Sequence, residues 1–209
     1  MAVSEVYNED CMIGMARYPD NYFELAIVDP PYGIDAANVK KYFSRNTKEY
    51  DKKDWDKNTP TKEYWEQLFR VSQNQIVCGG NYFIEYLHSS KCWIVWDKMN
   101  GTNDMPDCEL AWTSFDKKIR KFELHHFGAN YDKDRFHPTQ KPVALYKWLL
   151  KNYAKEGDKI LDTHLGSGSS RIACCDGGFD FYGWEIDKDY FDAMEKRFNT
   201  HIQQLTLDI

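Results

Sequence analysis

The chain has 209 residues, of which 42% are hydrophobic and 16% aromatic, and this composition predicts one ordered globular domain with a substantial core. Its net charge of −6 argues against a nucleic-acid binder that relies on overall basicity, although a local basic cleft stays open. The sequence contains no run of about 18 apolar residues and no signal-like start, so we expect a cytoplasmic protein with no membrane partner.

The first half of the chain alternates apolar runs with polar segments. A buried strand over 25–28 ends at "DPPYG", and a long polar, lysine-rich loop follows over 34–58. Thr59 and Pro60 then cap a helix that carries "YWEQLF". Three further strands are predicted in "NQIVCGG", "KCWIVWDK" and "CELAWTSF", and "KKIRKFELHHFG" is a fourth strand or a basic ribbon.

The second half predicts a regular alternation of helices and strands. Pro142 opens a helix, "KILD" is a strand that breaks into a glycine-rich turn, and "RIACCDGG" is a short helix. A strand in "FDFYGWEID" leads to Asp187, which caps the last helix. Strands that alternate with helices predict an α/β fold with a doubly wound parallel sheet, whose ligands bind beyond the carboxyl ends of the strands.

Six cysteines are scattered through apolar segments without a C-x-x-C pair. We interpret them as reduced thiols in or near the core rather than as metal ligands or disulfides. They are Cys11, Cys78, Cys92, Cys108, Cys174 and Cys175.

The tetrapeptide "DPPY", Asp29 to Tyr32, is the most unusual motif of the chain. Pro30 and Pro31 lack N–H donors and have fixed φ angles, so the carbonyl of Pro30 is aimed rigidly beside the Asp29 carboxylate. Two acceptors suit an exocyclic amine, and Tyr32 offers a stacking face for its ring. A structural Asp-Pro turn is the alternative.

Two further motifs point to a ligand. In "LDTHLGSGSS" the glycines allow close backbone approach, and Asp162 and Glu185 lie at strand ends, which favours a nucleoside cofactor over a plain strand-to-helix turn. In "FHPTQKP" polar side chains precede a helix N-terminus, where a carboxylate can bind or where the helix is simply capped.

Together, "DPPY", "HPTQKP" and "LDTHLGSGSS" closely resemble the S-adenosylmethionine-dependent DNA amino-methyltransferases, the adenine-N6 and cytosine-N4 group. The catalytic motif precedes the cofactor motif, as in the circularly permuted beta-type members. The resemblance covers essentially the whole chain and implies a single domain over 1–209 with a Rossmann-like fold, a mostly parallel sheet and one antiparallel strand. It also implies S-adenosylmethionine as cofactor, no metal ion and DNA as partner. Because beta-type relatives are often dimers, a homodimer is expected by analogy.

The resemblance also assigns site residues. Asp29, Pro30, Pro31 and Tyr32 match the catalytic tetrapeptide, and Asp29 is also expected near the cofactor. Family members commonly read D-P-F-x-G-S-G where this chain has "DTHLGSG", so His164 contacts the cofactor or fills the space of the phenylalanine; we favour the second. The remaining expected cofactor-binding residues are Asp10, Cys11, His137, Thr139, Gln140, Lys141, Asp162, His164, Leu165, Gly166, Ser167, Gly168, Ser169, Ser170, Glu185 and Ile186.

DNA contacts are expected from two basic clusters, one in the mobile 34–58 loop and one in a minimal target-recognition insert over 113–136. A solvated loop surface is the alternative for each. The candidates are Lys40, Lys41, Arg45, Lys52, Lys53, Lys117, Lys118, Arg120 and Lys121.

The Asp at the start of "DPPY" is more typical of adenine than of cytosine enzymes, so the sequence predicts transfer to the 6-amino group of a flipped adenine in DNA. A cytosine-N4 enzyme, a non-catalytic protein that binds cofactor and DNA, and transfer to RNA or to a protein glutamine are the alternatives.

Overall fold

The computed structural model describes residues 2–35, 53–101, 106–125 and 135–207. Eight strands form a single sheet in the order β1-β8-β7-β2-β3-β5-β4-β6. Their bounds are β1 Ser4–Tyr7, β2 Phe23–Val28, β3 Ser72–Cys78, β4 Trp93–Asp97, β5 Cys108–Thr113, β6 Arg120–Glu123, β7 Lys159–Asp162 and β8 Asp180–Trp184.

The sheet is mostly parallel. Strand β5 is antiparallel to both of its neighbours, β3 and β4, whereas β1, β8, β7, β2 and β3 pair in parallel and β6 pairs in parallel with β4. The expected doubly wound sheet with one antiparallel strand is therefore confirmed.

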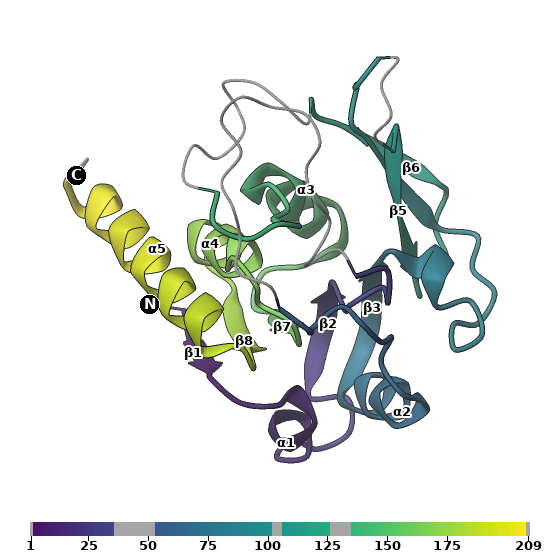
Figure 1. Cartoon of the computed structure of the whole chain (residues 1–209), viewed down its shortest axis with the longest axis horizontal. Helices are drawn as coiled ribbons and strands as arrows, with labels where there is room; N and C mark the ends of the chain where they lie inside the picture. Colours follow the sequence, from purple (N-terminus) through teal and green to yellow (C-terminus); the bar gives the residue numbers. More distant parts are fainter. Residues whose placement is uncertain (1, 36–52, 102–105, 126–134, 208–209) are drawn as a thin grey trace.

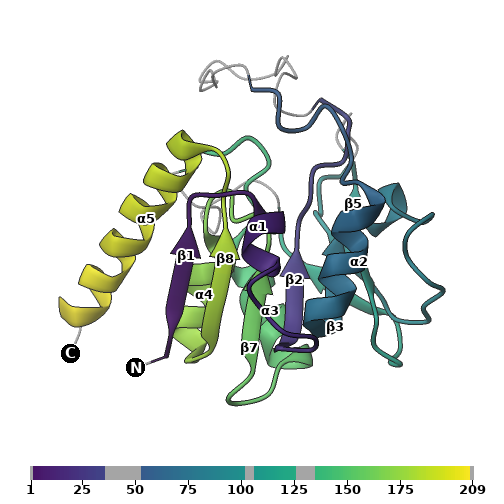
Figure 2. The ribbon, with the colours of Figure 1, turned by 90° about the horizontal axis from the view of Figure 1, so that it is seen from below.

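Helices cover both faces of this sheet (Figures 1 and 2). In Figure 2, α1 and α2 lie on one face and α3 and α4 lie on the other, while α5 flanks the β1 side. The helices are α1 Cys11–Met15, α2 Lys62–Val71, α3 Val143–Tyr153, α4 Ser169–Gly177 and α5 Lys188–Leu207, with a short 3₁₀ helix at Gly80–Tyr82. No helix of the described residues is long and apolar enough to cross a membrane.

Strand β2 explains how the two layers are held. Leu25 and Ile27 are buried in the core beneath α3 and α4, and Ala26 and Val28 are buried in the core beneath α1 and α2. Because successive side chains of a strand point to opposite faces, a continuous apolar run is what a strand covered on both faces requires.

The helix starts agree with the sequence in two of three cases. Pro142 is the N-cap of α3, and Asp187 accepts hydrogen bonds from the N–H groups of Asp189 and Tyr190 at the start of α5. The expected cap at Thr59 is wrong, because the N-cap of α2 is Thr61 and the helix begins at Lys62.

All six cysteines are free. Cys78, Cys92 and Cys174 are buried as expected, and Cys11 and Cys175 are half-buried. Cys108 is exposed at the start of β5, so the expectation of a core or near-core thiol is wrong there.

Candidate active site

The carboxyl ends of β2, β7 and β8 lie side by side because these strands are parallel neighbours. Asp29 follows β2, Asp162 ends β7, and Glu185 follows β8. The topology therefore brings the three predicted acids to one edge of the sheet, although they are far apart in the sequence.

Asp162 is buried at the foot of the glycine-rich turn. Its carboxylate accepts hydrogen bonds from the backbone N–H of His164, 3.0 Å away, and from the hydroxyl of Ser170, 2.5 Å away. Burial raises the pKa of the Asp162 carboxyl to about 7, although both hydrogen bonds favour its charged form. No lysine or arginine of the described residues forms an ion pair with this carboxylate, so a cationic ligand would stabilise its charged form.

Glu185 holds the backbone of the same turn. One carboxylate oxygen accepts a hydrogen bond from the N–H of Gly166 at 2.8 Å, and the other accepts one from the N–H of Asp187 at 2.9 Å. Burial raises the pKa of this carboxyl as well. The neighbouring Ile186 is exposed, at 65%, so it offers an apolar surface at the rim of the site.

Glycine is required at position 168. Its φ is +71°, and a Cβ there would lie 2.4 Å from Cγ of Met194 on α5. Arg197, also on α5, donates hydrogen bonds to the carbonyl of Ser167 and to the hydroxyl of Ser169, at 2.8 and 2.9 Å. The turn is thus fixed by the last helix, a contact that sequence reasoning missed.

His137 connects the "HPTQKP" segment to the turn. Its buried ring lies 4.3 Å from the Tyr190 ring, and a Cβ on Gly166 would lie 3.5 Å from its Nε2 atom. Burial and, to a smaller extent, the positive charge of Lys141 lower the pKa of His137 to about 3, so the ring is neutral. The Nδ1 atom lies 3.2 Å from the hydroxyl of Thr139, which fixes the ring.

The other residues of this segment differ in what they reach. Gln140 is buried and its side-chain oxygen accepts a hydrogen bond from the N–H of Phe136 at 3.4 Å, so it stabilises the local turn. Lys141 extends to the carboxylate of Asp29, with an Nζ–Oδ2 distance of 2.5 Å, and its expected place near the cofactor stays a prediction.

The His164 ring is held by a hydrogen bond at its Nδ1 atom. Its Nδ1 atom lies 2.9 Å from the hydroxyl of Thr163, and that hydroxyl lies 2.7 Å from the hydroxyl of Tyr64. Burial lowers the pKa of His164 to about 4, against the opposing effect of the Asp10 charge, so the ring is neutral. The ring therefore occupies a defined position, and its expected role as a filler stays a prediction.

Asp10 and Cys11 form the start of α1. The Asp10 carboxylate caps the helix by accepting a hydrogen bond from the N–H of Met12 at 2.8 Å. Cys11 is half-buried, and burial raises the pKa of its thiol to about 12, so it is not a reactive thiolate.

The tetrapeptide from Asp29 to Tyr32 is held by hydrogen bonds at both of its ends. The hydroxyl of Tyr32 donates a hydrogen bond to Oδ1 of Asp29 at 2.7 Å. The backbone N–H groups of Tyr32 and Gly33 donate to one oxygen of Asp56, at 2.6 and 3.1 Å. Asp56 is almost fully buried, and sequence reasoning missed it because it lies in a segment with no periodic pattern.

The Tyr32 ring turns inward in the described structure. It stacks on Tyr82, with ring centroids 4.7 Å apart and an interplanar angle of 14°. A Cβ on Gly79 would lie 2.3 Å from the Tyr32 ring, so only glycine allows this packing. One face of the expected stacking residue is therefore covered by a second, half-exposed tyrosine.

A chain of buried charges continues from Asp29 into the sheet. Lys141 lies 3.5 Å from Oε2 of Glu109, and Oε1 of Glu109 lies 2.6 Å from the ammonium of Lys98. The side chains of both lysines are nearly inaccessible, at 5% and 6%. Sequence reasoning gave no site role to Glu109, an acid within "CELAW", or to Lys98, which ends the family-like motif "WDK"; a lone acid in an otherwise apolar strand was the available signal.

This arrangement combines an acceptor for an amine with acids suited to a cationic nucleoside. The sequence profile of the N6_N4_Mtase family, described as DNA methylase, matches residues 89–196, which is more than half of the chain. The chain belongs to this family. This match confirms the resemblance of "DPPY", "HPTQKP" and the glycine-rich turn to the DNA amino-methyltransferases, and we refer to the chain below as the methylase.

Two relatives named type II methyltransferases are similar to the methylase. M.HpaI of Haemophilus parainfluenzae is 26% identical over 234 residues, which cover 87% of this chain and 69% of the relative. M2.DpnII of Streptococcus pneumoniae is 33% identical over 103 residues, which cover 49% of this chain and 34% of the relative. The match therefore covers about a third of the second relative's length.

Two solved structures share the fold. The M1.HpyAVI-SAM complex superposes with a TM-score of 0.63 at 20% identity, covering 92% of this chain and 98% of that chain. The PvuII DNA methyltransferase, described as cytosine-N4-specific, gives a TM-score of 0.63 at 12% identity, covering 94% of this chain and 87% of that chain. The Rossmann-like methyltransferase fold is confirmed, and the fold does not select the base.

S-adenosylmethionine is the cofactor of the methylase, and the residues present fit it. The cofactor carries a sulfonium and an ammonium, and Asp162 is a buried acid with a raised pKa and no cationic partner among the described residues. Gly166 has a φ of +49° and its N–H donates to Glu185, so the glycine-rich turn and this acid lie together at the strand ends. Within the described ranges, no cluster of three His, Cys, Asp or Glu side chains is arranged to hold a metal ion.

The expected DNA-contacting residues are only partly described. Lys40, Lys41, Arg45 and Lys52 lie outside the described residues, as do most of the 34–58 loop and residues 126–134 of the 113–136 insert.

The described candidates differ in their partners. Lys53 forms ion pairs with Asp187 and Asp189, at 2.9 and 2.6 Å, and so holds residues before α2 against the start of α5. In the second cluster, Lys121 pairs with Glu123 at 2.5 Å, and Lys118 is exposed.

Proposed function

We propose that the methylase transfers a methyl group from S-adenosylmethionine to the 6-amino group of a flipped adenine in DNA. The observation that carries this proposal is the position of Asp29. Its carboxylate lies at the carboxyl end of β2, next to the rigid Pro30 and Pro31, at the edge that also presents Asp162 and Glu185.

The amino nitrogen of adenine is a poor nucleophile because its lone pair is delocalised into the ring. In our proposal the Asp29 carboxylate and the Pro30 carbonyl accept its two hydrogens and draw the nitrogen toward a tetrahedral form. S-adenosylmethionine supplies an electrophilic methyl group on a sulfonium sulfur, which leaves as a neutral thioether. As the N–C bond forms, the amine gives up one proton toward the Asp29 carboxylate.

In this proposal, different residues of the chain bind different parts of the cofactor. Asp162 faces its positive charge, Glu185 accepts the ribose hydroxyls, and the turn from Leu165 to Ser169 lines the approach. Asp10 and Cys11 lie on the side of the adenine, with His164 beneath. His137 and Thr139 support the turn through the contacts described above.

The base has to leave the duplex to reach Asp29. We propose that the flipped base stacks against the Tyr32 and Tyr82 pair, whose stacked rings adjoin the Asp29 carboxylate. Phosphate contacts are assigned to the 34–58 loop and to the basic cluster Lys117, Lys118, Arg120 and Lys121, which makes a separate recognition domain unnecessary. The comparisons do not support the expected homodimer, and we propose no assembly.

A cytosine-N4 enzyme is the second candidate, because the cytosine-N4-specific PvuII enzyme shares the fold. Incubation with tritiated S-adenosylmethionine and unmethylated bacterial DNA, followed by digestion to nucleosides, separates the two. We expect label in 6-methyladenosine; label in 4-methylcytosine alone would refute the adenine assignment.

The role of Asp29 has its own test. We expect Asp29→Ala to abolish methyl transfer while calorimetry shows that S-adenosylmethionine still binds. Activity equal to that of the unaltered protein would refute the assigned role, and a loss of both activity and cofactor binding would place Asp29 in the cofactor site instead.

A further inference from the structure

The proposed function creates a conflict at Asp29. Both oxygens of its carboxylate are already occupied: Oδ1 accepts the hydroxyl of Tyr32 at 2.7 Å, and Oδ2 accepts the ammonium of Lys141 at 2.5 Å. A target amine is neutral, and a carboxylate binds an ammonium more strongly than a neutral donor. Each carboxylate oxygen can accept a second hydrogen bond, but at Oδ2 the amine competes with the Lys141 ammonium, and this competition is relieved if the ammonium moves to another acceptor.

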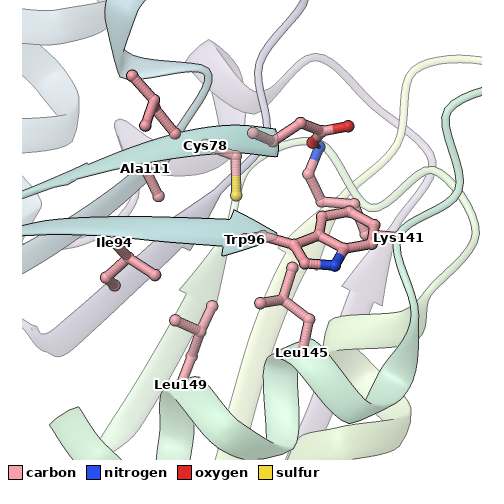
Figure 3. Close-up of a pocket in the computed structure, with 9 residues that line it drawn as sticks. Cys78, Ile94, Trp96, Ala111, Lys141, Leu145 and Leu149 are labelled. Carbon is pink, nitrogen blue, oxygen red and sulfur yellow. Dashed lines mark ion pairs between the residues drawn. The ribbon is translucent and has the colours of Figure 1, made fainter. Parts of the chain in front are cut away.

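Water has little access to the Lys141 ammonium, because only 5% of this side chain is exposed. The Lys141 side chain lies on apolar residues that include Trp96 and Leu145 (Figure 3). The cavity beside it has a volume of about 10 Å³, which is room for one water at most, and Glu109 and Lys141 are the charged residues of its lining. An ammonium released from Asp29 would keep only the Tyr32 hydroxyl, at 3.2 Å, and the more distant Glu109 carboxylate, at 3.5 Å. A buried charge with such weak partners is unfavourable unless a carboxylate comes closer.

Glu109 offers a prepared acceptor. Its Oε2 atom is buried, accepts no hydrogen bond in the described structure, and lies 3.5 Å from the Lys141 ammonium. Its Oε1 atom is held by Lys98 at 2.6 Å, so the carboxylate is fixed with Oε2 directed toward Lys141. Burial alone would raise the pKa of Glu109, but the two ammonium groups lower it to about 2, so the acceptor is charged at neutral pH.

We propose that Lys141 is a positioning residue that exchanges its carboxylate partner during the reaction. Its ammonium binds Asp29 in the free protein and moves to Oε2 of Glu109 when the target amine binds Asp29, while Lys98 keeps Glu109 in place. The proposal rests on the proposed function for the assignment of the amine to Asp29. It adds that two residues of the antiparallel strand region, Glu109 and Lys98, serve the reaction without touching the substrate.

The first test is structural and does not depend on activity. In a crystal structure of Asp29→Ala, we expect the distance from Nζ of Lys141 to Oε2 of Glu109 to shorten from 3.5 Å to about 2.8 Å. An ammonium that stays at the Tyr32 hydroxyl, with Glu109 no closer, would overturn the exchange.

The second test is kinetic and uses single-turnover methyl transfer to unmethylated bacterial DNA. We expect Glu109→Gln to slow transfer by about tenfold or more, because the ammonium then has no second carboxylate, with the affinity for S-adenosylmethionine unchanged within about twofold. The double variant Glu109→Gln with Lys141→Met should be faster than Glu109→Gln alone, because no charge remains to be moved. Lys147→Met, which removes a half-exposed lysine of α3, is the control.

The change in rate between Glu109→Gln and the double variant distinguishes the exchange from a purely structural role. A double variant that is as slow as, or slower than, Glu109→Gln would overturn the exchange, since a purely structural role predicts additive losses. If the unaltered protein transfers no methyl group to DNA, the proposed function fails, and the Asp29→Ala structure still decides whether Glu109 receives the ammonium.

Discussion

The Asp56 carboxylate lies 2.6 Å from the backbone nitrogen of Tyr32, a residue 24 positions earlier in the chain, and accepts its hydrogen bond. The same oxygen accepts a second bond from Gly33 at 3.1 Å. A buried side chain thus fixes the backbone of the "DPPY" segment directly after its two prolines.

Asp56→Ala is expected to slow methyl transfer by about tenfold or more, because two N–H groups beside the tetrapeptide lose their acceptor. The affinity for S-adenosylmethionine, measured by calorimetry, should change little. Asp54→Ala is the matched control, because Asp54 is exposed and pairs with Lys57 on the surface. Equal effects of the two variants on the transfer rate would contradict this role.

Binding of S-adenosylmethionine is expected to depend on pH through Asp162. Burial raises the pKa of this carboxyl to about 7, so in the free protein it becomes protonated as the pH falls below that value. A cationic ligand binds the ionised form, so the affinity should fall by up to about tenfold per pH unit below 7. Calorimetry from pH 8 to pH 5.5 measures the slope.

Asp162→Asn provides the control for this pH dependence. It retains an acceptor for the N–H of His164 and removes the titrating group. Its affinity for the cofactor should be weaker at pH 8 and nearly flat with pH. A slope as steep as that of the unaltered protein would assign the titration to another group, such as Glu185.

Two glycines at the ends of α4 offer a matched pair. Gly168 and Gly178 both have a φ of +71°, but only at Gly168 would a Cβ meet the Met194 side chain, at 2.4 Å. Alanine at either site costs about 1 kcal/mol in backbone strain, and the collision at position 168 adds about 1–3 kcal/mol. Denaturant unfolding should therefore show a larger loss for Gly168→Ala, and equal losses would mean that α5 yields without cost.

The basic cluster at the start of the edge strand β6 gives a prediction for DNA binding. Lys118 is exposed, whereas Lys121 pairs with Glu123. If Lys118 contacts a phosphate, Lys118→Ala should weaken binding uniformly across DNA sequences and reduce the slope of log K against log salt by about 1. Lys121→Ala should do less, and salt titrations of fluorescently labelled DNA compare the two.

Much of the fold followed from local patterns. The apolar run over 25–28 predicted a buried strand, and Pro142 and Asp187 marked helix starts that the structure confirms. The expected cap at Thr59 was wrong. A Thr-Pro pair is typical of a helix start, but a second threonine follows, and α2 takes Thr61 as its N-cap. Exposed Cys108 shows that residue type alone does not decide burial at a strand end.

The sequence by itself determined the family motifs, the parallel arrangement of strands and the edge at which the acids gather, because these depend on residue order and on the periodicity of a strand or helix. Only the tertiary structure decided what those acids contact. Lys141 reaches Asp29 across 112 positions, and Glu109 reaches Lys141 from the antiparallel strand. Such pairs form because the sheet order places β5 next to β3, and strand order arises from packing over the whole chain.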